Sequence, residues 1–272
     1  MSNPERPVLR YFGGKWALAP WVISHFPKHE IYLEPFGGGA SVLMRKPRSY
    51  AEIYNDLDGD IVNVFRVLQD TGKMEKLKTM LEVTPFSRLE FELAYEPCDD
   101  EIERARRTIV RSHFGIGENA TTGFKTGFRS NSFATGTHIG DTWINYRNHL
   151  PSFAERLMGV VIEQKDALDL MASIDAPNVL HFVDPPYVTS TRVVKRGYRH
   201  EMDDDKHGAL CEILKTLTGA VVLCGYKNEI YDSLKWETSN LKTKTGNTAE
   251  REEILWLNPK AWENQAQSSF AI

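Results

Sequence analysis

The stretch VLHFVDPPYV, residues 179–188, decides which fold this chain can adopt. It opens with an apolar run at 179–183, which is typical of a buried strand. Proline donates no hydrogen bond to a sheet, so the strand must end at Asp184, ahead of Pro185 and Pro186. A rigid turn with an acid and an aromatic residue, at a strand's carboxyl end, is where open α/β sheets bind ligands. The alternative is a plain strand-ending turn with a capping Asp.

Strand and helix signals alternate in the two outer parts of the chain. Apolar and β-branched runs predict buried strands at residues 30–36, 50–56, 159–164, 178–184 and 220–225. Helical patterns are found at residues 59–70, 166–174 and 203–217. Such alternation implies a mostly parallel sheet covered on both faces. A last strand at 251–259, after the turn-rich KTKTGNTAE, is expected to run antiparallel.

Residues 62–155 interrupt this alternation. They predict a second, mainly helical domain inserted into an α/β domain that comprises residues 1–61 and 156–272. Residues 100–114 form an amphipathic helical pattern with a basic face. The polar, glycine-rich residues 115–141 show no apolar periodicity, and a loop of this length is usually functional or disordered.

The net charge of −4 disfavours a nucleic acid partner, but the charge is distributed unevenly. From residue 104 to residue 147, seven basic residues stand against two acids. A local basic surface neutralises phosphates whatever the rest of the surface carries. The same region contains Phe124, Phe128 and Phe133, and basic residues interleaved with aromatic ones fit a surface that binds nucleic acid. A plain solvated loop is the alternative.

The composition, 41% hydrophobic and 26% charged, is that of a globular protein with one large domain or two unequal ones. The N-terminus lacks the apolar core of a signal peptide, and no apolar run approaches the roughly 20 residues of a membrane span. The cysteines form no CxxC pair, and no His/Cys cluster has metal-ligand spacing. We therefore expect a cytoplasmic protein that has no metal site and does not associate with a membrane.

The sequence EPFGGGAS at 34–41 follows the first predicted strand. Its three glycines allow a ligand to approach the backbone closely, and the next helix offers free N–H groups. The motif is neither GxGxxG nor a P-loop, which disfavours a dehydrogenase and an ATP site. Asp56, after the second strand, is placed to hold ribose hydroxyls or to cap the next helix.

The sequence LRYFGGKW at 9–16 places Lys15 among the aromatic residues Tyr11, Phe12 and Trp16. Such a cluster can cover a ligand that carries both an aromatic ring and a carboxylate.

YFGGK, EPFGGGAS, the acid after the second strand and DPPY, in this order, resemble the Dam-type DNA adenine-N6 methyltransferases, the alpha-group of the D12 class. The inserted region resembles their target-recognition domain, and GYKNEIYD and REEILWLN near the C-terminus are also similar. The resemblance covers nearly the whole chain. Tyr11 stands where this family often has Trp, and it still supplies an aromatic face.

This resemblance implies a Rossmann-like methyltransferase fold and S-adenosylmethionine as the cofactor, with S-adenosylhomocysteine as its product. Lys15 would lie near the cofactor carboxylate, Asp56 at the ribose and Asp166 at the adenine. The residues implied in cofactor binding are Tyr11, Lys15, Phe36, Gly37, Gly38, Gly39, Asp56, Asp166 and Asp184.

The resemblance also implies that the methyl acceptor is N6 of an adenine flipped out of double-stranded DNA. The Asp184 carboxylate and the Pro185 carbonyl would accept the two N6 hydrogens. Pro185 and Pro186 would fix that geometry, and Tyr187 would stack on the base. No metal and no covalent intermediate is required, because the reaction depends mainly on positioning.

Contacts with DNA are expected from the inserted region and from the segment TSTRVVKRGYRH at 189–200, which we expect to close on the DNA backbone. The residues expected to make them are Arg111, Lys125, Arg129, Arg192, Lys195 and Arg196.

Other functions remain open at this stage. Protein-glutamine methyltransferases have a related motif with Asn usually at position 184, and cytosine-N4 enzymes usually have Ser there, so Asp184 favours adenine. A catalytically silent DNA-binding module with the same fold is an alternative of another class. We expect a monomer of prokaryotic or phage origin, and the sequence specifies neither a recognition site nor a cognate restriction enzyme.

Overall fold

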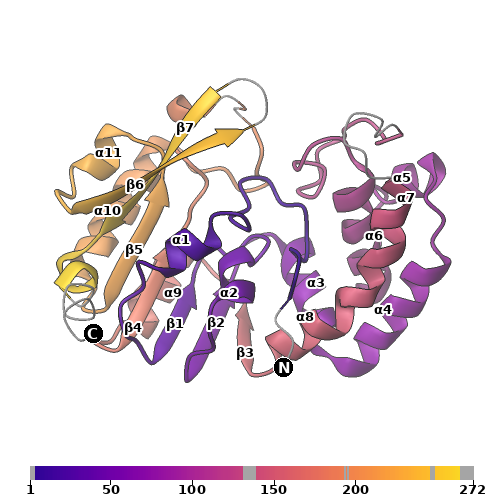
Figure 1. Ribbon diagram of the computed structural model, residues 1–272, viewed down its shortest axis with the longest axis horizontal. Coiled ribbons are helices and arrows are strands. Elements are labelled where there is room, and N and C mark those ends of the chain that lie inside the picture. The colour runs from indigo at the N-terminus through magenta and orange to yellow at the C-terminus, as the bar shows by residue number, and fades with distance from the viewer. Residues whose placement is uncertain (1–3, 131–138, 193, 195, 246–248, 264–272) are drawn as a thin grey trace.

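Seven strands form a single sheet in the computed structural model, which describes residues 4–130, 139–192, 194, 196–245 and 249–263 (Figure 1). Their order is β3-β2-β1-β4-β5-β7-β6. The first five in chain order are parallel: β1 (Ile31–Glu34), β2 (Ala51–Asn55), β3 (Val160–Glu163), β4 (Val179–Val183) and β5 (Ala220–Gly225). The last two are β6 (Glu237–Thr245) and β7 (Ala249–Leu257), and β7 runs antiparallel to both of its neighbours, β5 and β6.

This arrangement confirms the predicted α/β class, with a mostly parallel sheet and an antiparallel C-terminal pair. Strand β6 was not predicted, and it includes residues 242–245 of the expected turn. Its sequence, ETSNLKTKT, is almost entirely polar, as befits an edge strand with one neighbour. Apolar periodicity therefore could not reveal it.

The sheet is buried on both faces, because successive residues of its central strands enter opposite cores. In β4, Leu180 and Phe182 pack into one core, whereas Val179 and Val183 pack into the other. The first core also contains residues of α1 (Ala19–Ile23) and α2 (Ser41–Arg45). The second contains residues of α9 (Ala167–Ile174), α10 (Asp204–Thr216) and α11 (Glu229–Asp232).

A group of helices lies beside the β3 edge of the sheet (Figure 1). It consists of α3 (Gly59–Gln69), α4 (Thr71–Val83), α5 (Arg88–Leu93), α6 (Glu101–Phe114), α7 (Ile139–Tyr146) and α8 (Leu150–Leu157), with a 3-10 turn at Arg147–His149. Helix α7 begins inside the stretch that was expected to be a loop up to residue 141.

The helical group shares a continuous core with one face of the sheet. The ring of Tyr54 in β2, for example, lies 4.6 Å from the ring of Phe65 in α3. The two expected boundaries of the inserted domain, near residues 62 and 155, fall inside α3 and α8. The division into a catalytic domain and an inserted recognition domain stays a prediction.

Candidate active site

The candidate site lies where the order of the strands reverses. β1 and β4 are neighbours, but the chain continues from β1 toward β2 and from β4 toward β5, on opposite sides. Open α/β sheets bind ligands at such a switch point, beyond the carboxyl ends of the strands. Here these ends carry Glu34 as the last residue of β1, Asp56 directly after β2 and Asp184 directly after β4.

Two adjoining cavities occupy this edge, and they share Tyr11, Phe36, Gly38, Asp184 and Tyr198 in their walls. The larger, of about 230 Å³, is also lined by Asp56, Asp166 and Pro186. The smaller is also lined by Lys15, Gly37, Gly39 and Glu34. All nine residues implied in cofactor binding therefore line one cavity or the other, although they span residues 11 to 184.

The glycine turn after β1 is shaped by aromatic side chains. A Cβ atom on Gly37 would lie 2.1 Å from the Tyr54 ring, and one on Gly38 would lie 2.5 Å from the Tyr11 ring. The Tyr54 hydroxyl donates to the Gly38 carbonyl at 2.7 Å, and the φ of Gly38 is 46°. The glycines are thus required by packing within the protein, a reason that the sequence did not reveal.

Asp56 is fixed beside this turn by two backbone N–H groups. Its Oδ2 accepts from Gly38 at 2.8 Å, and its Oδ1 accepts from Asp58 at 2.8 Å. Helix α3 is capped instead by Asp58, whose carboxylate accepts from the N–H of Asp60, so Asp56 is not its cap. Burial raises the pKa of Asp56 to about 6.

Asp166, in contrast, caps helix α9. Its Oδ1 accepts from the backbone N–H of Leu168 at 2.8 Å. It also lines the larger cavity, so Asp166 both caps helix α9 and forms part of the cavity wall.

Lys15 joins the N-terminal segment to the DPPY turn. Its Nζ lies 3.1 Å from Asp184 Oδ1 and 4.6 Å from the centre of the Tyr187 ring, and it donates to the Gly13 carbonyl at 2.8 Å. The contact with Asp184 is not aligned as a hydrogen bond, and Oδ1 accepts none from the described residues. Burial raises the pKa of Asp184 to about 6, although the charge of Lys15 opposes this shift.

Tyr187 is buried behind the turn, with 5% of its surface exposed. Its ring meets the edge of Tyr226 at a centroid distance of 4.7 Å. Its hydroxyl donates to Glu253 Oε2 at 2.7 Å and lies 3.2 Å from Cys224 Sγ. The ring orientation is therefore set by partners on β5 and β7.

Glu34 was not recognised from the sequence as a site residue, although it is the first letter of EPFGGGAS. It is 3% exposed and accepts hydrogen bonds from the Tyr32 hydroxyl at 2.8 Å and the Leu43 N–H at 3.1 Å. Burial raises the pKa of Glu34 to about 8. The feature of the sequence that could have identified Glu34 is an acid at the carboxyl end of a predicted buried strand.

Tyr198 was also missed, because its segment reads as a basic loop. It lines both cavities, and its hydroxyl lies 2.3 Å from the position that a Cβ atom on Gly13 would take. Its ring packs against Phe12 at a centroid distance of 5.2 Å. The segment that follows DPPY therefore covers the N-terminal YFGGK motif.

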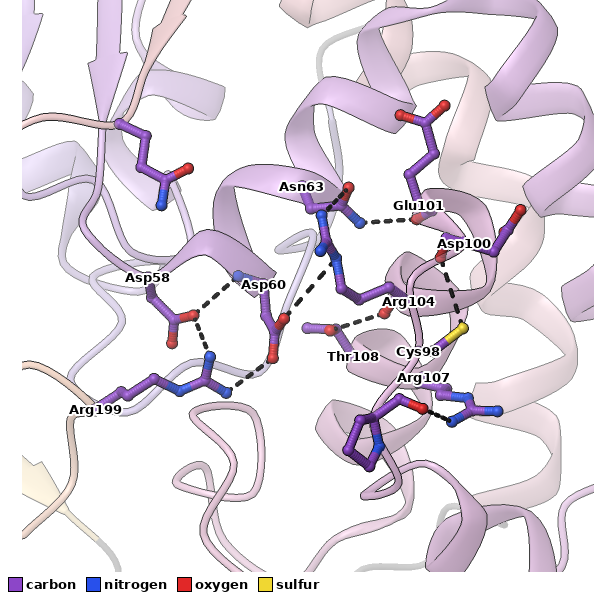
Figure 2. A network of polar contacts seen from close by, with 12 residues as sticks. Asp58, Asp60, Asn63, Cys98, Asp100, Glu101, Arg104, Arg107, Thr108 and Arg199 are labelled. Atoms are coloured by element: carbon purple, nitrogen blue, oxygen red, sulfur yellow. Dashed lines mark hydrogen bonds and ion pairs between the residues drawn. The ribbon is translucent and has the colours of Figure 1, made fainter.

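Ion pairs hold this segment to the wall of the larger cavity. Arg199 donates to Asp58 Oδ1 at 2.9 Å and to Asp60 Oδ2 at 2.8 Å, as Figure 2 shows. Thr122, from the inserted region, donates to the Gly197 carbonyl at 2.8 Å. The covering segment is thus tied both to the start of α3 and to the inserted region.

Two of the arginines expected at DNA are engaged within the protein, which corrects those expectations. Arg111 is 6% exposed and donates to the Ala94 carbonyl at 2.8 Å and to Asp60 at 3.1 Å. Arg192 is also 6% exposed and forms an ion pair with Glu201 at 2.6 Å. Buried, paired guanidinium groups are not available to phosphate.

The other expected DNA contacts lie in different surroundings. Lys125 and Arg196 are exposed, and Arg129 is half-buried. Phe128 packs against Phe86 at a centroid distance of 5.2 Å, so it belongs to the helical core and is not a free base wedge. Lys195 and Phe133 lie outside the described residues.

Within the part of the chain that the structure describes, no group of three or more His, Cys, Asp or Glu residues could hold a metal ion. No described helix is both long and apolar enough to cross a membrane.

A mostly parallel sheet in which β7 alone is reversed, and an acid-lined cavity at its switch point, define a Rossmann-like methyltransferase. More narrowly, residues 11–245 match the D12 class N6 adenine-specific DNA methyltransferase family, and the chain belongs to that family.

Individual relatives share only part of their sequence with this chain. A DNA adenine methylase of Salmonella typhi is 24% identical over 190 residues, which cover 67% of this chain and 65% of the relative, so the match spans slightly less than two thirds of that protein. A DNA N-6-adenine-methyltransferase of Escherichia phage P1 is 30% identical over 66 residues, covering 24% of this chain and 8% of the relative. An rRNA methylase structure from Streptococcus thermophilus covers 89% of this chain and 93% of its own at 9% identity, with a TM-score of 0.35.

The position of Arg111 leads to a prediction about stability. Arg111→Ala would remove the Asp60 ion pair and leave the Ala94 carbonyl without its donor. We expect the free energy of unfolding to fall by about 1–3 kcal/mol in denaturant titrations. The exposed Lys125→Ala is the control and should change it by less than about 0.5 kcal/mol. Equal stability of the two variants would contradict the assignment of Arg111 as a structural residue.

Proposed function

We propose that this protein transfers a methyl group from S-adenosylmethionine to N6 of an adenine in double-stranded DNA. The observation that carries the proposal is the position of the DPPY turn. Asp184 and Pro186 border the same cavity as Tyr11, Phe36 and Asp56, so an acceptor at the turn and a cofactor in the cavity would be neighbours. Membership of the D12 class supports adenine as the acceptor base.

The residues present fit the proposed cofactor. The cavity offers aromatic faces from Tyr11 and Phe36 and the carboxylates of Asp56 and Asp184. Asp58 Oδ2 is buried without a hydrogen-bond partner among the described residues, and so is Asp184 Oδ1. Asp56 would hold ribose hydroxyls, and Asp166 would lie at the adenine end. S-adenosylmethionine would supply a methyl group already activated by its sulfonium.

The turn itself is suited to hold an amino group. Asp184 Oδ1 faces the ammonium of Lys15, which lies over the Tyr187 ring. Lys15 thus occupies the kind of position that the N6 amino group requires, a donor facing the carboxylate above an aromatic face. Asp184 and the Pro185 carbonyl would accept the N6 hydrogens and favour the lone pair that attacks the methyl group.

Duplex DNA is the proposed substrate, bound by the basic side chains that are not buried in ion pairs within the protein. Lys125 and Arg196 are exposed, and Arg129 is half-buried. Lysines and arginines that contact phosphates supply affinity without reading sequence. We propose that Arg111 and Arg192 support this surface from within, through Asp60 and Glu201.

The role of Asp184 can be tested by single-turnover transfer from methyl-labelled cofactor to DNA. Asp184→Ala should slow N6-methyladenine formation by about a hundredfold or more, because the acceptor of the N6 hydrogens is lost. Asp184→Asn, which keeps an oxygen but no charge, should retain a small residual rate. The exposed Asp205→Asn serves as the control and should behave as wild type. Near-normal transfer by Asp184→Ala, or label on cytosine or protein, would refute the proposal.

The pH dependence follows from the buried carboxylates. Asp184 and Asp56 each have a pKa of about 6, raised by burial, and both act in the ionised form. kcat/KM reports the free enzyme, so it should be highest above about pH 7 and fall as pH decreases through about 6. Steady-state rates between about pH 5 and pH 8 would show this. A flat profile over that range would be incompatible with an essential carboxylate that titrates near pH 6.

A further inference from the structure

Glu253 lies behind the candidate site, in contact with Tyr187, although its sequence context, a polar-apolar strand near the C-terminus, does not indicate this position. It belongs to β7, which runs antiparallel to β5. Ile254 pairs with Gly225, the last residue of β5, so Glu253 lies just beyond the carboxyl end of β5. The reversed direction of β7 thus brings its first half to the same edge of the sheet as Asp184.

The carboxylate of Glu253 is buried, with 6% of the residue exposed. Its Oε2 accepts the hydroxyl of Tyr187 at 2.7 Å and lies 3.8 Å from Cys224 Sγ. Burying a carboxylate is costly unless hydrogen bonds or opposite charges compensate. A buried apolar residue could fill this space without that cost, so the carboxylate calls for a role beyond packing.

The charge of Glu253 acts on the catalytic turn. It raises the pKa of Lys15 together with Asp184, against the effect of burial, and it raises the pKa of Asp184. Lys15 therefore experiences two carboxylates, Asp184 in direct contact and Glu253 behind the Tyr187 ring. Tyr187 connects Lys15 to Glu253, through its ring face to the first and through its hydroxyl to the second.

We propose that Glu253 is a positioning residue for the methyl-transfer reaction: it holds the Tyr187 ring through its hydroxyl and balances the charge of Lys15 beside Asp184. This inference rests on the proposed function. Glu253 does not touch the base or the cofactor in this account, and it acts through Tyr187 and through its charge. A purely structural role would instead affect stability and leave the reaction of the folded protein unchanged.

A double-mutant cycle tests the link to Tyr187. Glu253→Ala and Tyr187→Phe each remove one side of the same hydrogen bond, and each should lower the single-turnover rate by about tenfold or more. Because the two changes break one interaction, the double variant should be little slower than the slower single variant. Cofactor affinity, measured by calorimetry, should stay near wild type. Fully multiplicative losses would overturn the proposal.

The charge of Glu253 is tested separately by Glu253→Gln, which keeps an oxygen that can accept from Tyr187. Removing the negative charge should lower the pKa of Asp184 and leave that of Asp56 in place, so the acidic limb of kcat/KM, which both groups shape, should fall less steeply below about pH 6. A limb of unchanged position and steepness would contradict the proposal. Exposed Glu252→Gln, one residue earlier in β7, is the matched control and should leave the limb in place. The groups around Asp184 that enter this balance are Lys15, Glu34, Tyr187, Tyr198, Cys224, Tyr231 and Glu253.

A third readout needs no DNA and separates this inference from the proposed function. With carbon-13 in the tyrosine ring, the Tyr187 signal, assigned with Tyr187→Phe, should shift in Glu253→Ala and remain near its wild-type position in Glu252→Gln. A shift in a protein that does not methylate DNA would refute the proposed function and keep the Tyr187–Glu253 link. If the protein methylates DNA and the Tyr187 signal does not shift in Glu253→Ala, the inference alone is refuted.

Discussion

Three carboxylates, one buried and two half-buried, meet at one edge of the sheet, and the rest of the site compensates for the cost of removing them from water. Parallel strands β1, β2 and β4 all end at this edge: Glu34 is the last residue of β1, and Asp56 and Asp184 directly follow β2 and β4. Burial raises their pKa values to about 8, 6 and 6. Lys15 is buried against Asp184 and offsets part of this negative charge. A cationic cofactor would offset more of it.

The covering segment depends on the same acidic edge. Arg199 reaches Asp58 and Asp60, and Tyr198 then lies over Gly13 and lines both cavities. Asp60 also pairs with Arg111 of α6. The acids at the start of α3 therefore connect the cavity cover to the inserted helical region, which we propose to bind DNA.

Much of the fold could be predicted from sequence, because central strands are apolar runs and their ends carry recognisable turns. The nine residues implied in cofactor binding were brought together from motifs far apart in the chain. Periodicity could not find β6, whose residues are polar. The composition of 104–147 also could not distinguish exposed Lys125 from buried Arg111, since partners such as Asp60 are set by the tertiary fold.

Glu253 and Tyr198 show the same limit at the site itself. Glu253 meets Tyr187 across 66 residues, and only the antiparallel direction of β7 brings it to the carboxyl edge. Tyr198 sits in a segment whose basic residues masked its contact with Phe12. Both contacts depend on how distant segments pack, and neither leaves a periodic signal in the sequence.

We propose that this acidic edge binds a cationic cofactor, and proton release on binding tests this most directly. Calorimetry at about pH 6, in buffers of different ionisation enthalpy, counts protons released by S-adenosylmethionine and by S-adenosylhomocysteine, whose sulfur is neutral. The sulfonium should favour ionised Asp56 and Asp184, so S-adenosylmethionine should release more protons than S-adenosylhomocysteine. Equal release by both ligands, or proton uptake with S-adenosylmethionine, would contradict the account.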